Sequence, residues 1–401
     1  MKVVIAPDSF KECLSALEAA RAISEGVLEA CPNATIDLCP MADGGEGTVD
    51  AMVAATGGAY RTADVFDPLG KPIRARFGLL GRAVQTNLPG EVGLAGAILA
   101  LEPGAAELSG TAVIEMAAAS GLQLVPPDRR NPLRTTTFGT GQLILASLDA
   151  GAREVVLGIG GSATTDGGCG GAQALGVTFI GRDGRAIMCG MGGGAIADVA
   201  DFDMSGLDER VRRTRIRVAC DVTNPLTGPN GSAAVYGPQK GATAEMVAQL
   251  DANLAHLAEL IRRKLGLEVQ NMPGAGAAGG LGAGLVAFAG ARIERGVEVV
   301  ADAVGLKRRL AGADLCLTGE GRLDAQSRLG KTTYGVAALA NALGVPVICI
   351  PGQAEAGAAH EIFQRVLPLV GQDVTVRQAL AQPKSLLRLR ARQAMYARQG
   401  R

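Results

Sequence analysis

The strongest constraint on the fold is a repeated unit, in which a short apolar run is followed by a glycine-rich or acidic loop and then by a helix. The runs Lys2–Ala6 and Thr35–Cys39 begin two such units at the N-terminal end of the chain. The runs Asp314–Thr318 and Val345–Ile350 begin two more near the C-terminal end. Successive strand–helix units pack as a parallel sheet with helices on its faces. The pattern therefore predicts an α/β protein.

A different kind of sequence separates these two ends. Pro and Gly in the segment DPLGKP, Asp67–Pro72, mark a crossing between structural units. Beyond it, the amphipathic segment Ala244–Leu265 predicts a long helix. Three further apolar runs each end in a polar or glycine loop, at residues 112–116, 155–159 and 216–220.

This organisation predicts two domains. Residues 1–66 and 291–401 are expected to form one discontinuous domain with a Rossmann-like or flavodoxin-like parallel sheet. Residues 67–290 are expected to form an inserted second α/β domain. A length of 401 residues fits two hydrophobic cores better than one. Open α/β sheets bind ligands at the carboxyl ends of their strands, so we expect the ligand in the cleft between the domains.

Charge and composition restrict the partners. The chain has 39 Lys and Arg against 39 Asp and Glu, so no overall field attracts nucleic acid or an anionic membrane. Aromatic residues make up 3% and do not alternate with basic residues as in a stacking groove. The chain opens on a strand without a signal peptide, and no apolar run reaches membrane-spanning length. We expect a small-molecule ligand and no nucleic acid or membrane partner, and a homo-oligomer is compatible with these features.

The cysteines and histidines exclude further classes. The eight cysteines are widely spaced and form no C-x-x-C pair, so neither a zinc site nor a disulfide framework is indicated. A reducing, cytoplasmic location is expected. The two histidines, His256 and His360, have no triad-like context, which disfavours a Ser-His-Asp hydrolase.

Two glycine patterns match dinucleotide fingerprints only in part. Gly158–Ala163 fits G-x-G-x-x-A after a strand, but it continues into TTDGGCGG instead of an apolar helix. Gly274, Gly276 and Gly279 fit G-x-G-x-x-G, but a helix and a loop precede them. These matches leave an NAD-dependent oxidoreductase of a small hydroxy acid as an alternative. A non-catalytic protein that binds a small ligand is a second alternative.

The segment Gly330-Lys331-Thr332 resembles the end of a P-loop. The full motif requires glycine five residues before Gly330, and that position is Ala325. Lys331 is still a candidate phosphate ligand, because a helix begins there and a helix N-terminus favours an anion. The glycine loop Gly160, Gly161 and Ser162 supplies the other candidate nucleotide-binding residues.

Charged and hydroxyl side chains gather in five loops that follow predicted strands. These residues are Asp8, Ser9 and Lys11; Asp43 and Glu46; Asp166; Asp221; and Glu320, Arg322 and Asp324. Phosphoryl transfer uses such a set, because carboxylates hold Mg²⁺, cations offset the charge of the transferring group and an Asp accepts the hydroxyl proton. It requires neither histidine nor a thiol pair.

The chain resembles the bacterial type-1 glycerate kinases from residue 1 to about 380. The segments that carry the resemblance include APDSFKECLSA from Ala6, PMADGGEGT from Pro40, NPLRTTTFGTGQLI from Asn131, LGIGGSATTDGGCGGAQALG from Leu157, ACDVTNPLTGPNGSAAVYGPQKGA from Ala219 and TGEGRLDAQSRLGKT from Thr318. The resemblance implies ATP-dependent phosphorylation of D-glycerate, with 2-phosphoglycerate as the usual product. It also implies a two-domain α/β fold with the site in the cleft. Glu12-Cys13 and Thr165 depart from the usual family residues.

The individual roles leave alternatives open. Asp166 or Asp221 is expected to accept the proton, and Glu320 and Asp324 are the candidate Mg²⁺ ligands. Arg322 and Lys240 are candidates for the charge that binds the substrate carboxylate. The remaining candidate substrate-binding residues are Asp8, Ser9, Lys11, Asp43 and Glu46. Lys11 is alternatively a ligand of an ATP phosphate, and Asp43 and Glu46 are alternatively Mg²⁺ ligands.

Overall fold

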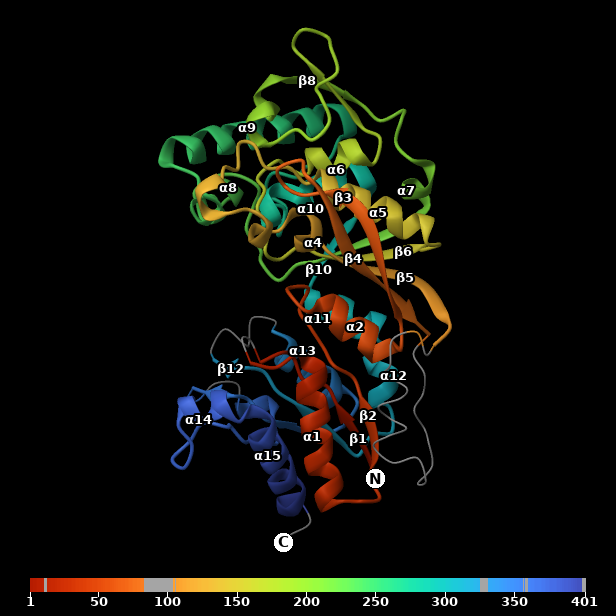
Figure 1. The fold of residues 1–401 in the computed structure, drawn as a ribbon, viewed down its shortest axis with the longest axis vertical. Helices are drawn as coiled ribbons and strands as arrows, with labels where there is room; N and C mark the ends of the chain where they lie inside the picture. The colour runs from red at the N-terminus through yellow and green to blue at the C-terminus, as the bar shows by residue number, and fades with distance from the viewer. Residues whose placement is uncertain are drawn as a thin grey trace.

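The computed structural model describes residues 1–10, 13–82, 104, 106–324, 331–355, 357 and 360–398. Two main sheets lie one above the other, and the N-terminus and the last described helix both lie in the lower half of Figure 1. The predicted α/β class is confirmed. Lys11, a candidate substrate-binding residue, lies outside the described residues.

The lower sheet is parallel and combines strands from both ends of the chain. Its order is β2 (Thr35–Leu38), β1 (Lys2–Ile5), β11 (Leu315–Thr318), β13 (Val347–Cys349) and β15 (Arg365–Val366). Counted within the sheet, this order is 2-1-3-4-5, the flavodoxin-like arrangement. The strand order reverses between β1 and β11, and ligands of such sheets bind at that point.

The upper sheet is mixed. Its order is β10 (Arg292–Glu294), β9 (Arg215–Ala219), β6 (Glu154–Gly158), β5 (Leu108–Glu115), β4 (Pro72–Gly81) and β3 (Ala59–Phe66). The first four strands are parallel, whereas β4 is antiparallel to both β5 and β3. The domain boundaries at residues 67 and 291 stay a proposal. Because β3 and β10 pair within this sheet, the pairing would group them with residues 67–290 and not with the two ends of the chain.

The helices form layers on and between the sheets (Figure 1). Helices α1 (Ala16–Ala30) and α15 (Pro383–Arg398) cover the outer face of the lower sheet with one apolar cluster, to which Val3 and Ile5 of β1 contribute. Val4, on the opposite face of β1, belongs to a second cluster that also holds Val156 of β6. Side chains alternate between the faces of a strand, so this second core lies between the two sheets.

Four helices fill the space between the sheets: α2 (Thr48–Thr56), α11 (Gly296–Ala303), α12 (Leu306–Leu310) and α13 (Thr332–Ala342). A third apolar cluster covers the far face of the upper sheet. Its helices include α5 (Phe138–Asp149), α6 (Cys169–Ala174), α9 (Ala244–Leu265) and α10 (Leu281–Ala289). The predicted helix Ala244–Leu265 coincides with α9, whose buried side includes Leu250, Leu254 and Leu257.

The remaining elements are short. The other helices are α4 (Ala117–Ser120), α7 (Glu209–Arg213), α8 (Ser232–Tyr236) and α14 (Val376–Ala381), with 3₁₀ turns that include η3 (Gly193–Asp198), η4 (Pro238–Lys240) and η5 (Ala277–Gly280). Two small sheets pair β7 (Thr178–Gly181) with β8 (Val199–Asp203) and β12 (Arg322–Leu323) with β14 (Gln353–Ala354). Over the described part of the chain, no helix has the length and apolar character to cross a membrane.

Candidate active site

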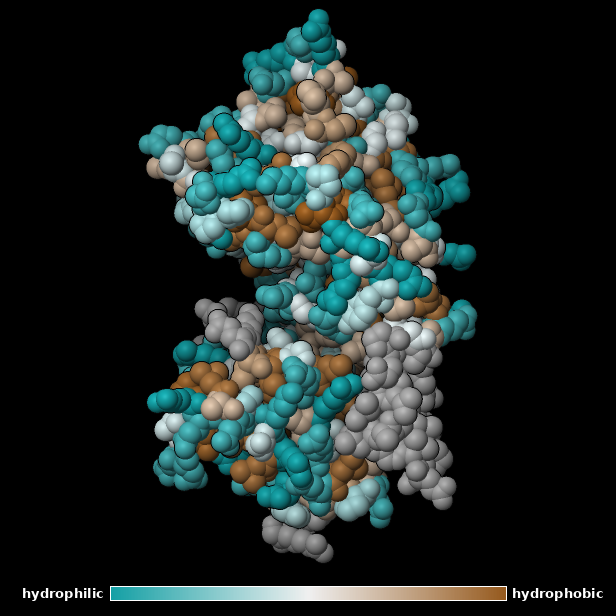
Figure 2. Space-filling view, in the orientation of Figure 1, coloured by the Kyte–Doolittle hydropathy of each residue, from teal (hydrophilic) through white to brown (hydrophobic). Residues whose placement is uncertain are grey.

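The carboxyl ends of the two sheets meet at the loop 43–47, which follows β2. Gly44 lies against the strand ends of the upper sheet, because a Cβ added there would touch Ala219 of β9. A Cβ added at Gly158 would overlap the carbonyl oxygen of Gly44. Glycine at these two positions therefore permits the close approach of the lower loop to the upper strands. The surface in Figure 2 narrows at this level, between the upper and lower halves.

A cavity of about 240 Å³ lies where the two edges meet. Residues from both sheets line it: Asp43, Gly44, Gly45, Ile159, Gly160, Gly161, Ser162, Ala219, Cys220, Asp221, Val222, Tyr236, Gln239, Ala277 and Ala278. A larger cavity of about 590 Å³ lies at the ends of β1 and β2. Its lining consists of Asp8, Ser9, Phe10, Cys13, Leu14, Ser15, Asp43, Gly45, Glu46 and Gly47. Asp43 and Gly45 line both cavities, so the two adjoin each other.

Asp221 follows β9 and lines the smaller cavity. Its Oδ1 accepts a hydrogen bond of 2.9 Å from the backbone N–H of Gly296, the first residue of α11. Burial raises the pKa of Asp221 to about 6, and the negative charges of Asp43 and Asp8 act in the same direction. The Gly296 N–H and Arg295 oppose that rise. A carboxylate with this pKa is suited to accept a proton near neutral pH.

A partly buried ion-pair network around Arg217 fixes the strand end that carries Asp221. The guanidinium of Arg217 in β9 donates two hydrogen bonds to Glu294 of β10, at 2.9 and 2.8 Å. It also donates to Asp302 of α11 at 2.6 Å. Gly296 is the first residue of α11, the helix that also carries Asp302. The network therefore fixes Asp221 relative to the Gly296 N–H that donates to it.

The glycine loop after β6 presents backbone donors to the smaller cavity. Gly161 has a left-handed φ of 72°. The N–H groups of Gly160, Gly161 and Ser162 donate to no acceptor within the described residues. Successive N–H groups around a left-handed residue form a concave site for an anion. The loop therefore suits a carboxylate or a phosphate, and it was predicted to bind the nucleotide.

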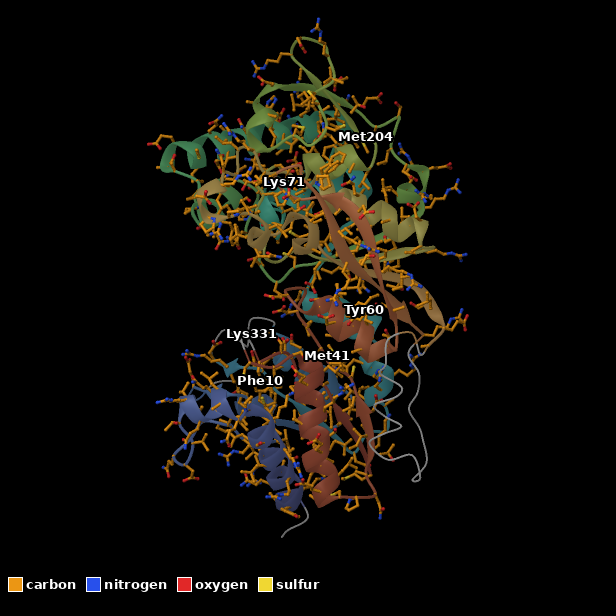
Figure 3. All side chains as sticks on the ribbon, in the orientation of Figure 1. Phe10, Met41, Tyr60, Lys71, Met204 and Lys331 are labelled. Carbon is orange, nitrogen blue, oxygen red and sulfur yellow. The ribbon has the colours of Figure 1, made fainter. Side chains whose placement is uncertain are left out.

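The candidate metal ligands lie beside Lys331, after β11. The Nζ of Lys331 is 2.9 Å from Oδ1 of Asp324 and 3.8 Å from Oε2 of Glu320. Lys331 precedes α13, and the buried hydroxyls of Thr332 and Thr333 at the start of that helix have no hydrogen-bond partner among the residues that the structure describes. Figure 3 shows Lys331 and Phe10 at the upper edge of the lower half. This cluster lies at the strand-order reversal, where the N–H of Asp8 donates to the carbonyl of Gly319.

These residues fit Mg²⁺ with a bound nucleotide. Mg²⁺ is usually held by one or two carboxylates together with phosphate oxygens and waters. Glu320 and Asp324 supply two carboxylates close to the Nζ of Lys331, and Thr332 follows Lys331 in the sequence. Within the described ranges, no cluster of three His, Cys, Asp or Glu side chains forms a metal site from protein ligands alone.

Asp166, the other candidate proton acceptor, is completely buried and lines neither cavity. Its Oδ2 accepts from the N–H and hydroxyl of Thr137, both at 2.7 Å, and from the N–H of Gly170 at 3.3 Å. Its Oδ1 accepts from the N–H of Gly168 at 3.2 Å. Burial raises the pKa of Asp166, and these donors oppose that rise. The geometry favours a structural role at the start of α5, because the carboxylate already has its partners.

Two candidate cations also lie away from the cavities. The Nζ of Lys240 is buried and donates to the carbonyl of Thr164 at 2.6 Å. Burial lowers the pKa of Lys240 to about 7. Arg322 is exposed, and its guanidinium pairs with Glu355. Neither side chain lines a cavity that also contains Asp221, so the arrangement does not support a contact of either with the ligand there.

Two residues that line the smaller cavity, and one acid that holds the start of α2, were not singled out from the sequence. Tyr236 and Gln239 line the smaller cavity, but no spacing rule indicates them. The side chain of Glu115 accepts a hydrogen bond of 2.8 Å from the N–H of Val49, so the upper sheet holds the start of α2. Glu115 ends a strand, which is the signal that identified Asp221 and the other acids.

The fold and the site define an α/β protein with adjoining ligand cavities at the facing carboxyl edges of two sheets. The model of the glycerate kinase family matches residues 3–399, and the chain belongs to that family. The glycerate kinase of Bacillus subtilis is 51% identical over 88% of this chain and 85% of its own. The glycerate 2-kinase of Escherichia coli K12 is 48% identical over 90% of this chain and 88% of its own. The crystal structure of a glycerate kinase 2 from Salmonella typhimurium LT2 matches with a TM-score of 0.86 and 46% sequence identity, and the match covers 100% of this chain and 98% of that chain.

Proposed function

We propose that this protein is a glycerate kinase, which transfers the γ-phosphoryl group of ATP to the 2-hydroxyl of D-glycerate and releases 2-phosphoglycerate and ADP. Membership of the family and the names of the relatives support the reaction. One structural observation carries the proposal: two adjoining cavities of unequal size share Asp43 and Gly45, and the smaller one holds the Asp221 carboxylate. Direct transfer between two substrates requires such adjoining sites.

We assign the two substrates to the two cavities by size. The 240 Å³ cavity suits the three-carbon acid, and the 590 Å³ cavity suits the nucleotide. Backbone N–H groups of Gly160, Gly161 and Ser162 would bind the glycerate carboxylate instead of the nucleotide. Asp8, Ser9 and Glu46 would then lie beside the nucleotide instead of glycerate, with Asp43 between the two substrates.

The reaction then follows from the positions of the carboxylates. The glycerate hydroxyl oxygen attacks the γ-phosphorus while the bond from that phosphorus to the oxygen bridging to the β-phosphate breaks. Asp221 accepts the hydroxyl proton, and ADP leaves with the bridging oxygen. Glu320 and Asp324 would hold Mg²⁺, which neutralises charge on the phosphate oxygens. Lys331 and the N-terminus of α13 would bind a phosphate group.

The pH dependence tests the assignment of Asp221. A base must be deprotonated, so kcat/KM for glycerate should be level above pH 7 and fall about tenfold per unit below pH 6. Because the charge of Asp43 raises the pKa of Asp221, Asp43→Asn should move the acidic limb to lower pH. The profile is measured with saturating ATP and excess Mg²⁺. If the acidic limb of the kcat/KM profile does not move in Asp43→Asn, a group other than Asp221 is responsible for it.

Lys331→Met should raise the KM for ATP roughly 10- to 100-fold, the effect of losing one charge-assisted hydrogen bond. The KM for glycerate should change little, because Lys331 lies on the nucleotide side. Initial rates at varied ATP concentration measure the effect. Lys384→Met is the matched control, since Lys384 is exposed and pairs with Glu18 on the outer helices. An unchanged KM for ATP in Lys331→Met would remove Lys331 from the nucleotide site.

Release of ADP from Mg-ATP and D-glycerate tests the function itself. Phosphorus NMR of the product distinguishes 2-phosphoglycerate from 3-phosphoglycerate. No ADP above the level without glycerate would overturn the proposal. Binding of NAD with turnover of a hydroxy acid would then support an oxidoreductase, and glycerate binding without turnover would support a binding protein.

The cytoplasmic location belongs to the same proposal. No disulfide joins the cysteines of the described residues, as expected in a reducing compartment.

A further inference from the structure

Ala278 has an unusual backbone conformation. It is the one non-glycine residue with positive φ in the described ranges, at φ 52° and ψ 37°. In this left-handed region the Cβ of an L residue lies too close to a neighbouring carbonyl oxygen, and glycine has no such strain. Gly279 and Gly280, which follow, have φ of 73° and 88°. Ala278 therefore keeps a methyl group in a turn whose other left-handed positions are glycine.

The turn cannot shift to relieve this strain. The N–H of Gly276 donates to the carbonyl of Asn224 at 3.0 Å, and the N–H of Gly167 donates to the carbonyl of Gly279 at 2.9 Å. Gly279 also packs directly on the backbone of Thr164, where no Cβ would fit. The position of the Ala278 methyl is therefore set by backbone contacts on both sides of it.

Ala278 lines the smaller cavity together with Asp221 and the loop at Gly160 and Gly161. The two glycines contribute only backbone to this lining. The space for the carbon chain of a ligand therefore depends on the side chains that remain. Among those, the Ala278 methyl is the one held in place by a strained backbone.

We propose that Ala278 is a specificity-determining residue, whose methyl group restricts the smaller cavity to three-carbon hydroxy acids and holds their hydroxyl toward Asp221. The inference rests on the proposed function and deepens it, because it names the group that limits substrate length. Removing the methyl should give a longer acid room to bind. It should also leave glycerate less well oriented.

The test is Ala278→Gly, assayed with D-glycerate and with a four-carbon hydroxy acid of the same configuration at C2. The ratio of the two kcat/KM values should move about tenfold or more toward the four-carbon acid, as expected for one methyl group in a pocket. The thermal midpoint should be unchanged or higher, because glycine relieves the strain. Ala→Gly normally lowers stability. A changed specificity ratio together with an unchanged or higher thermal midpoint therefore distinguishes a ligand contact from a merely structural role.

Ala277→Gly is the matched control for stability. Ala277 lines the same cavity without a positive φ, so its replacement should lower the thermal midpoint. An unchanged specificity ratio in Ala278→Gly, with an active wild-type protein, would overturn the inference. A fall in thermal midpoint as large as that of Ala277→Gly would overturn the strain argument. No ADP release by the wild-type protein would overturn the proposed function itself, and the inference with it.

Discussion

Asp221→Asn should lower kcat on the order of 10²- to 10⁴-fold, the usual contribution of a positioned general base. Asn preserves the size of the side chain, and its amide oxygen can still accept from the Gly296 N–H. The group that takes the proton is lost, whereas the binding contacts of both substrates remain. The KM values should therefore change much less than kcat. Steady-state rates with glycerate and ATP varied in turn measure the effect.

Asp64→Asn is a suitable control for this substitution. Asp64 lies exposed on β3, outside the lining of both cavities, so its replacement should leave kcat unchanged. Circular dichroism and thermal melting should show that the Asp221→Asn protein is folded. Nearly wild-type kcat in folded Asp221→Asn would mean that another group accepts the proton.

Asp166→Ala should cost about 3–5 kcal/mol of stability, because it leaves several buried donors without an acceptor at about 1–3 kcal/mol each. The carboxylate accepts from Thr137, Gly168 and Gly170, and none of these donors can reach water in its place. A loss of this size is a large part of the 5–15 kcal/mol that typically separates the folded and unfolded states of a protein. Denaturant unfolding monitored by circular dichroism measures it.

The comparison of the two aspartates separates their roles. Asp221→Asn should stay folded and lose turnover, and Asp166→Ala should lose stability first. If Asp166→Ala kept its stability but lost turnover, Asp166 would return as the candidate base. The sequence leaves these two residues as alternatives, because each is an aspartate in a loop that follows a predicted strand.

Local patterns were sufficient to predict the α/β class. Strand–helix alternation depends on residues close together in the chain, and for that reason the helix predicted from about Ala244 to Leu265 agrees with α9. The antiparallel pairing of β3, β4 and β5 was not foreseen. Pairing partners are chosen by the packed fold, and a strand pattern alone does not indicate direction.

The candidate site was predicted as a set of strand-end loops, and this set divides in the structure. Asp8, Asp43 and Asp221 line cavities, whereas Asp166 and Lys240 point into the protein. The direction of a loop side chain depends on what packs against it. For Asp166 the packing group is the backbone at the start of α5, which lies almost 30 residues earlier in the chain.

Local sequence patterns were enough to predict the repeated strand–helix units, the loops that carry chemistry and the family resemblance, because each of these depends on neighbouring residues. The packing of the whole chain sets which loops meet across the two sheets, which acid is buried among donors and which lines a cavity. The tertiary structure also revealed the strained Ala278 in the same cavity lining as Asp221. These features arise from contacts between segments distant in the chain, and no local pattern contains them.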